Sequence, residues 1–318
     1  MGVDERSLGR HDTSRRQGAG RVSDASNPGG ERVVAAEQRR VIHSWEPEPR
    51  MTTDTKSAHG WRPQRFMVIV GHPDDADFGP AGTAAAWIDA GSEGWLVCCT
   101  SGDAGGEDPE ANPLELAQAR EDEQRRAARI VGYEGVSFLH QPDGNLVNDL
   151  ALREMLVREI RTFKPDAVLA GDPEVVIHRG GGINHTDHRA AAMAAVDAVY
   201  PAARNPMVFP WVHRQGLPAH RVRRLYLMWS NQADVWVDVS ATADRKIDAL
   251  RAHESQLHDP EAVFARVRIR MAEQGAEIGV AAAESYRLVV IDADPADDDS
   301  AEANAAEPKP ATEPPKTR

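Results

Sequence analysis

Cysteine is scarce in this 318-residue chain, which has only Cys98 and Cys99, side by side in an apolar run. Because successive strand residues point to opposite faces of a sheet, a disulfide between the two is not expected. Two adjacent cysteines also match no cysteine-based zinc site, and the lack of a disulfide framework is typical of a reducing cytosol. The sequence therefore predicts a cytoplasmic protein.

Long apolar runs and an excess of positive charge are missing as well. No run of about 18 apolar residues could cross a bilayer, and the first residues lack the apolar core of a signal peptide. The chain has 37 basic and 50 acidic residues, a formal net charge of −13. A negative surface repels phosphate backbones and anionic lipids. We therefore expect a small-molecule partner, with no nucleic-acid binding and no membrane insertion.

Composition divides the chain into three parts. Residues 1–60 are rich in Arg, Ser, Gly, Glu and Asp with few apolar positions, which predicts a disordered segment. Residues 291–318 form an Ala/Pro-rich acidic stretch, which predicts a solvated tail. Residues 61–290 have the length and apolar content of one domain.

Within that domain, short apolar runs alternate with segments of helical period. Strands are expected at 66–70, 95–99, 135–139, 167–170, 225–229 and 235–239, and helices at 80–90, 114–131, 150–160, 188–200, 243–257 and 260–274. Alternating strands and helices form parallel sheets with right-handed crossovers. The expected fold class is α/β, a Rossmann-like three-layer fold with a mostly parallel sheet.

Two short motifs follow two of the expected strands. His-Pro-Asp-Asp at 72–75 follows the first strand, and His-Thr-Asp-His at 185–188 follows the fourth. In a doubly wound sheet of order 3-2-1-4 these two strands are neighbours, and their carboxyl ends border the crevice where such folds bind ligands. The fold should therefore bring the two motifs together.

The residue types in these motifs suit a mononuclear metal site. A catalytic zinc commonly takes three His or carboxylate ligands and keeps a fourth position for water. His72, Asp75 and His188 supply such a set. We expect Zn²⁺ as the cofactor, with Fe²⁺ as the alternative.

The remaining polar residues of the motifs suit acid-base work. Asp74 is expected to act as the general base, and His185 to stabilise an oxyanion or protonate a leaving amine. Asp187 is expected to orient a ligating imidazole. Each motif alone also has a simpler interpretation, because Pro and Asp form turns and Thr186 or Asp187 could cap a helix.

The sequence resembles the LmbE-like, or PIG-L, de-N-acetylases. The resemblance rests on HPDDADFG at 72–79, Gly82-Thr83, TSGD at 100–103, Arg120 with Glu123, KPD at 164–166, HTDH at 185–188, and Lys246 to Gln256. It implies a Rossmann-like, usually zinc-dependent amidase that removes acetyl or other acyl groups from amines, often on N-acetylglucosamine conjugates. The resemblance also implies that His72, Asp75 and His188 are the metal ligands. It implies Asp74 as the general base and His185 as the residue that stabilises the transition state.

Two departures from the family pattern are present. Ala76 and Asp77 follow the HPDD motif where many members have Glu directly after it, and Thr186 replaces a frequent Pro. Neither change removes a predicted ligand. Both are expected to alter loop shape and therefore the choice of substrate.

Three further residues are predicted to bind substrate. Asp103 lies in a Gly-rich loop after the second strand, Arg120 in the next helix, and Asp143 after the third strand. The competing interpretations are a solvent loop for 100–109, a helix-surface pairing of Arg120 with Glu123 or Gln124, and a simple turn at Asp143.

The expected function is removal of an acyl group from a small polar N-acyl substrate. A mycothiol-conjugate-type amidase of the same family is one alternative. A two-histidine, one-carboxylate Fe(II) oxygenase is another, although such sites usually occupy β-barrels. A nucleotide-binding module is the third, weakened by the absence of G-x-G-x-x-G after the first strand. Assembly into a homo-oligomer is compatible with all of them.

Overall fold

A computed structural model describes residues 59–106 and 108–293 of the chain. The disorder predicted for residues 1–60 and the tail predicted for 291–318 fall almost entirely outside these ranges. The described residues contain every segment for which a strand or helix was expected.

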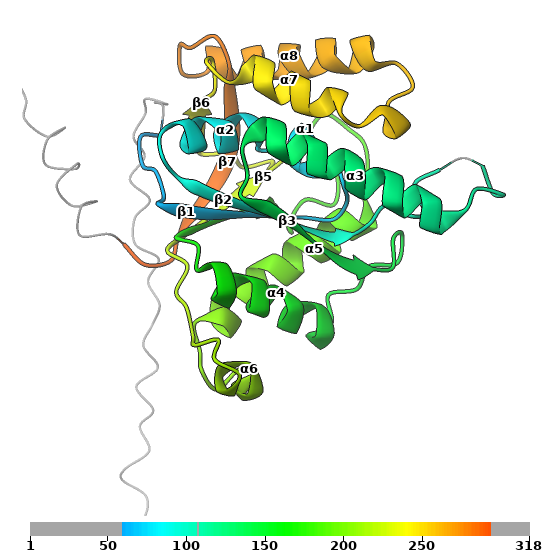
Figure 1. Cartoon of the computed structure of the whole chain (residues 1–318). Coiled ribbons are helices and arrows are strands. Elements are labelled where there is room, and N and C mark those ends of the chain that lie inside the picture. The colour runs from blue at the N-terminus through cyan, green and yellow to red at the C-terminus, as the bar shows by residue number, and fades with distance from the viewer. Residues whose placement is uncertain (1–58, 107, 294–318) are drawn as a thin grey trace, which may run out of the picture. The chain divides into compact units, whose positions relative to one another are not determined.

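A seven-stranded sheet of order β3-β2-β1-β4-β5-β7-β6 forms the centre of the fold (Figure 1). Strands β1 to β5 pair in parallel, and β7 is antiparallel to both β5 and β6. The strands are β1 Arg65–Val70, β2 Glu93–Thr100, β3 Gly135–Gln141, β4 Ala167–Gly171, β5 Arg224–Met228, β6 Val235–Asp238 and β7 Ala283–Val290. The predicted mostly parallel sheet is confirmed, including β1 beside β4.

Helices cover both faces of the sheet and complete three layers (Figure 1). On one face lie α2 Ala81–Asp89, α3 Pro113–Val131, α7 Ala243–Arg251 and α8 Pro260–Ala276. On the other lie α4 Leu150–Phe163, α5 Thr186–Asp197, the π-helical turn Ala198–Ala203 and α6 Pro210–Arg214. The short α1, Asp75–Phe78, follows β1 directly.

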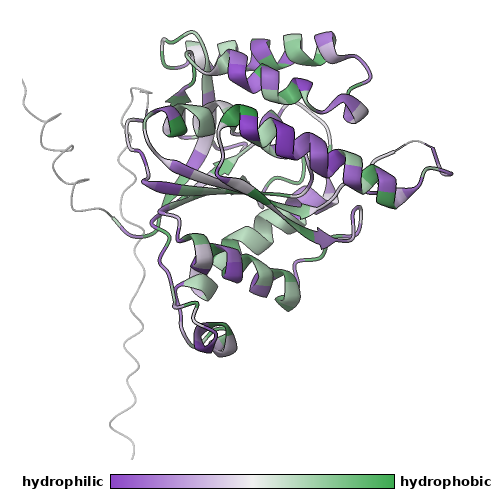
Figure 2. Ribbon diagram, viewed as in Figure 1, coloured by the Kyte–Doolittle hydropathy of each residue, from purple (hydrophilic) through white to green (hydrophobic). Residues whose placement is uncertain are grey.

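Strand β1 shows why the sheet is buried on both sides. Phe66, Val68 and Val70 pack into the core beneath α2 and α3, while Met67 and Ile69 pack into the core beneath α4 and α5. A strand that is apolar at every position suits a central place in a parallel sheet. In Figure 2, helix α3 is purple, that is hydrophilic, along most of its length, whereas α5 is white to green, that is neutral to hydrophobic.

Three elements were not predicted: α1, α6 and β7. Helices α1 and α6 have four and five residues, too few to show a 3.6-residue period. Strand β7 reads Ala-Glu-Ser-Tyr-Arg-Leu-Val-Val, and its buried Glu284 conceals the apolar pattern. Helix α7 also ends at Arg251, earlier than the predicted 257, and a 3₁₀ turn, Glu254–Gln256, follows it.

Candidate metal centre and active site

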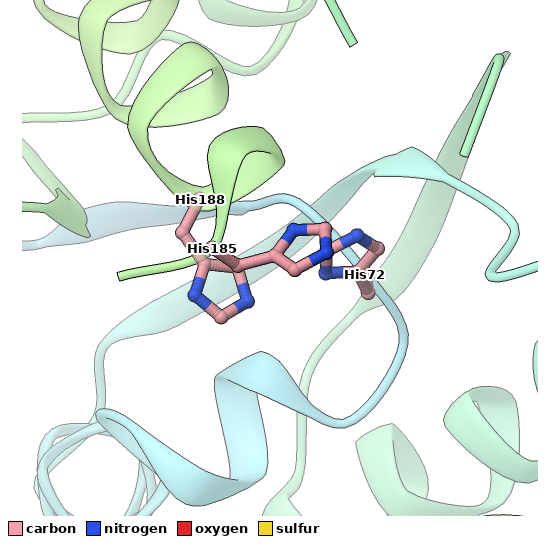
Figure 3. A group of neighbouring side chains, drawn as sticks. All are labelled: His72, His185 and His188. Carbon is pink, nitrogen blue, oxygen red and sulfur yellow. The ribbon is translucent and has the colours of Figure 1, made fainter. Parts of the chain in front are cut away.

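The carboxyl ends of β1 and β4 bring the two motifs together. Val68 of β1 pairs with Leu169 of β4, so the segments that follow these strands leave the sheet side by side. Figure 3 shows the rings of His72, His185 and His188 gathered between the start of α5 and the loop after β1. Their centroids are 4.9 to 5.3 Å apart. The predicted meeting of the two motifs is confirmed.

The carboxylate of Asp75 lies between two of these rings. Its Oδ1 is 3.0 Å from Nε2 of His188, and its Oδ2 is 3.4 Å from Nδ1 of His72. Donor atoms about 2.0–2.2 Å from a tetrahedral zinc lie roughly 3.3–3.5 Å from one another, so this spacing suits ligands of one ion. His185 has a ring nitrogen within 4.8 Å of the nitrogens of His72 and His188. The three histidines therefore form a donor group that could hold a divalent metal, and Asp75 contacts two of them.

His72 is held from behind by two more carboxylates. Its Nε2 lies 3.0 Å from Asp143 Oδ1 and 3.4 Å from Asp187 Oδ2, which leaves Nδ1 facing Asp75. Burial lowers the pKa of His72, but its hydrogen bonds to Asp143 and Asp75 outweigh that effect and raise the pKa to about 11. The surroundings of this imidazole therefore favour positive charge, as expected around a cation.

The group His72, Asp143 and Asp187 also has ligand atoms within 4.8 Å of one another. Its carboxylates, however, are occupied by backbone amides. Asp143 Oδ2 accepts from the amide of Ala104 at 2.8 Å, and Asp187 accepts from the amides of residues 144 and 146 at 2.6 and 3.2 Å. Such anchored carboxylates orient a ligating histidine. Asp187 and Asp143 are thus both placed to orient His72, and the role of each stays a prediction.

Asn184 orients His188 and was not found from the sequence. Its Oδ1 lies 3.2 Å from Nδ1 of His188, and its amide donates to the carbonyl of Val175 at 2.9 Å. An Nδ1–H donated to Asn184 leaves Nε2 of His188 free to face Asp75. The sequence signal for this contact is that Asn184 stands four residues before His188 and has a side-chain oxygen that can accept a hydrogen bond from the ring.

Asp74 adopts a backbone conformation that side chains rarely take, with φ 91° and ψ −31°. Its amide donates to Oε1 of Gln124 at 2.7 Å, and its side chain lines the cleft. Burial, and next the charge of Asp75, raise the pKa of Asp74 to about 7. A carboxylate of raised pKa suits the predicted general base, since a base works best when its pKa is near the working pH.

A buried polar group holds Asp74 in this conformation. Gln124 donates to Oδ2 of Asp77 at 2.8 Å, and Nε2 of His253 lies 2.9 Å from the same oxygen. Asp77 and His253 are wholly buried. Burial lowers the pKa of His253, but the hydrogen bond to Asp77 overcomes this and raises it. Asp77, at the family departure, thus supports the segment that carries Asp74, with His253 as its buried partner.

Lys246 supports the same segment from α7. Its ammonium group donates to the carbonyls of Phe78 and Gly79, at the end of α1, and pairs with Glu284 at 2.6 Å. Glu284 in turn accepts from the amides of Gly82 and Thr83 at the start of α2. This pair fixes the connection between α1 and α2, directly after the HPDD motif.

His185 caps α5 with its own ring. Its Nδ1 accepts from the amide of Asp187 at 3.2 Å, so the helix cap is His185 rather than the expected Thr186 or Asp187. In the neutral ring the proton then resides on Nε2. The side chain is exposed and lines the cleft, where this N–H can donate to a substrate.

A cleft of about 970 Å³ opens beside the histidines. Arg120 and Asp143 line it, whereas Asp103 is not among its lining residues. Arg120 donates to the carbonyl of Gly105 at 2.6 Å, and a Cβ at Gly105 would fall 2.1 Å from its guanidinium. Gly102 and Gly105 therefore allow this loop to approach Arg120 closely.

No helix in the described ranges is both long enough and apolar enough to cross a membrane.

Comparisons with known proteins agree with this geometry. Residues 67–199 match the PIG-L family, described as GlcNAc-PI de-N-acetylase. A diacetylchitobiose deacetylase from Thermococcus kodakarensis is 30% identical over 205 residues, which cover 63% of this chain and 72% of the relative. A 1D-myo-inositol 2-acetamido-2-deoxy-alpha-D-glucopyranoside deacetylase from Kineococcus radiotolerans is 26% identical over 284 residues, 72% of this chain and 78% of the relative.

A solved structure shows the same fold. The N,N'-diacetylchitobiose deacetylase from Pyrococcus horikoshii, solved with an inhibitor, aligns with a TM-score of 0.66 and 28% identity. The alignment covers 72% of this chain and 84% of that protein. Together with the shared sequence and the clustered motifs, this likeness shows that the chain belongs to the PIG-L, or LmbE-like, family of metal-dependent de-N-acetylases, hydrolases of amide bonds.

Proposed function

We propose that this protein is a zinc-dependent N-deacetylase that removes the acetyl group of an N-acetylglucosamine-type conjugate in the cytoplasm. The observation that carries the proposal is the placement of Asp75 between His72 and His188, with Asp74 beside it in the cleft. The named substrates of the two relatives, both acetamido sugars, support the substrate class. A cleft of about 970 Å³ has room for a sugar conjugate.

His72 through Nδ1, Asp75, and His188 through Nε2 would hold the zinc. When bound, zinc lowers the pKa of a coordinated water and polarises the scissile carbonyl. Asp143 and Asn184 hold the two imidazoles so that these nitrogens face Asp75. Three protein ligands leave one position open, as a catalytic site requires.

Two residues of the chain handle the protons. Asp74 accepts a proton from the attacking water, because its carboxylate is next to a ligand and faces the cleft. His185 donates a hydrogen bond from Nε2–H to the oxygen that gains charge, and Asp74 passes the proton it has accepted to the leaving amine. The backbone of Asp74, held by Gln124, and the ring of His185, held by the amide of Asp187, keep these groups aimed into the same space.

The alternatives account for less of the structure. A mycothiol-conjugate-type amidase would use the same residues, so substrate assays must separate it from a deacetylase. An Fe(II) oxygenase could use the same ligands, but the α/β fold and the family membership favour hydrolysis. A nucleotide-binding module would need its first strand-to-helix turn open for phosphates, and α1 with the HPDD motif fills that turn.

The proposal is tested by acetate release from N-acetylglucosaminides before and after metal removal. We expect chelation to lower kcat by at least about 100-fold, because the open coordination position supplies the nucleophile, and one equivalent of zinc to restore it. Restoration by Fe²⁺ alone would assign the metal differently. Undiminished acetate release from the chelated, metal-free protein would contradict the proposal.

A further inference from the structure

One wall of the cleft is formed by α8, well outside the two motifs. Val267, Arg270, Met271 and Gln274 line the cleft from this helix. Their spacing of three, four and seven residues places them on one helical face. Arg270 therefore lies on the face of α8 that borders the cleft, and its side chain is exposed to solvent.

A hairpin at 176–184 forms another part of the cleft wall. Its arms are joined by a bridge between Ile177 and Ile183, and its residues His178 and Arg179 line the cleft. Asn231 fixes the position of Arg179, since its Oδ1 accepts from the Arg179 amide at 2.8 Å and its carbonyl accepts from the guanidinium at 2.9 Å. The guanidinium thus has a defined location and unused N–H donors.

Both arginines lack a carboxylate partner among the described residues. The acidic residues that line the cleft are Asp74, Asp75, Asp143 and Glu284. The first three belong to the metal centre, and Glu284 is paired with Lys246. Arg270, His178 and Arg179 line the same cleft, and burial and next the charge of Arg270 lower the pKa of His178. Positive charge is therefore concentrated here in a chain whose net charge is −13.

We propose that Arg179 and Arg270, which line the same cleft as the metal centre, form a subsite for an anionic substituent on the substrate, a carboxylate or a phosphate. This inference rests on the proposed function, because the anion belongs to the amine product that deacetylation releases. Guanidinium groups suit both anions, since their N–H donors pair with two oxygens at once. The conjugate would reach from the metal centre, where its acetamide is cleaved, to the arginines with its charged aglycone.

The test uses three glycosides of N-acetylglucosamine that differ in the group at C1. The methyl glycoside is neutral, the carboxymethyl glycoside carries a carboxylate, and the 1-phosphate carries a phosphate. We expect kcat/KM to be higher for at least one charged substrate, and Arg179→Gln and Arg270→Gln each to lower the charged-to-neutral ratio of kcat/KM by about fivefold to twentyfold. Comparison of the two charged substrates identifies the anion.

Arg266→Gln is the matched control, because Arg266 lies on the same helix, is exposed and does not line the cleft. We expect it to leave the ratio unchanged. Added salt should reduce the preference for the charged substrates of the wild-type protein. Equal kcat/KM for all three glycosides, or an unchanged ratio in both arginine variants, would overturn the subsite while leaving the deacetylase proposal standing. Absence of acetate release from every glycoside would instead count against the proposed function itself.

Discussion

Replacing Asp74 by asparagine is expected to lower kcat for acetamide hydrolysis by about 100- to 10,000-fold, the usual contribution of a positioned general base. An asparagine amide has nearly the shape of the carboxylate but cannot accept the proton of the attacking water. The amide of residue 74 would still donate to Gln124, so the loop and the neighbouring Asp75 keep their places. The measurement is steady-state acetate release with the substrate that the wild-type protein prefers.

Two comparisons separate this effect from a loss of metal or of folding. Asp74→Asn should keep the zinc content of the wild type, because the ligands proposed for the metal are His72, Asp75 and His188. Asp108→Asn removes an exposed carboxylate from the loop after β2 and should retain full activity. Near-normal kcat in Asp74→Asn would show that another group accepts the proton.

Replacing Lys246 by methionine is expected to lower the free energy of unfolding by about 3–5 kcal/mol, the range seen when one partner of a buried ion pair is removed. Glu284 would lose the partner 2.6 Å away and remain as a buried charge, and the carbonyls of Phe78 and Gly79 would lose their donor. The end of α1 should loosen, and with it the segment that carries Asp74 and Asp75. Urea unfolding of the full chain measures this loss.

Arg245→Met provides the matched control on the same helix. Arg245 pairs with Asp89 at 2.7 Å, but the two side chains are 34% and 50% exposed to solvent, so the expected loss is about 0–1 kcal/mol. In the double variant Lys246→Met/Glu284→Gln we expect part of the lost stability to return, because no buried charge is left without a partner. A cost for Lys246→Met no larger than that of Arg245→Met would contradict this assignment.

Much of the fold was predictable because the strands of a parallel sheet carry a strong signal. Residues 66–70 and 167–170 are apolar at every position and each run is followed directly by glycine. That these segments are strands, and that β1 lies beside β4, followed from general rules. The meeting of the two motifs followed from that neighbourhood. The antiparallel β7 was missed because its buried Glu284 acts as a partner for Lys246, a tertiary contact that leaves no local pattern.

The site was predictable where its residues stand in motifs and less so where they stand alone. His72, Asp74, Asp75, His185 and His188 were placed together in advance, and the structure brings them to one cleft. The residues that orient them come from distant segments, and only the fold reveals their contacts. Asn184, the buried pair Asp77 and His253, and the amide of Ala104 on Asp143 are of this kind. The predicted substrate contacts of Asp103, Arg120 and Asp143 stay predictions.

Metal content in the wild-type protein and in the variants Asp75→Ala and His188→Ala tests the central claim most directly, because the whole mechanism requires these residues to share one ion. Purified under identical conditions and analysed by elemental mass spectrometry, the wild type should hold about one zinc per chain. Both variants should hold far less while their circular dichroism spectra remain those of a folded protein. Zinc retained at the wild-type level in both folded variants would contradict the account.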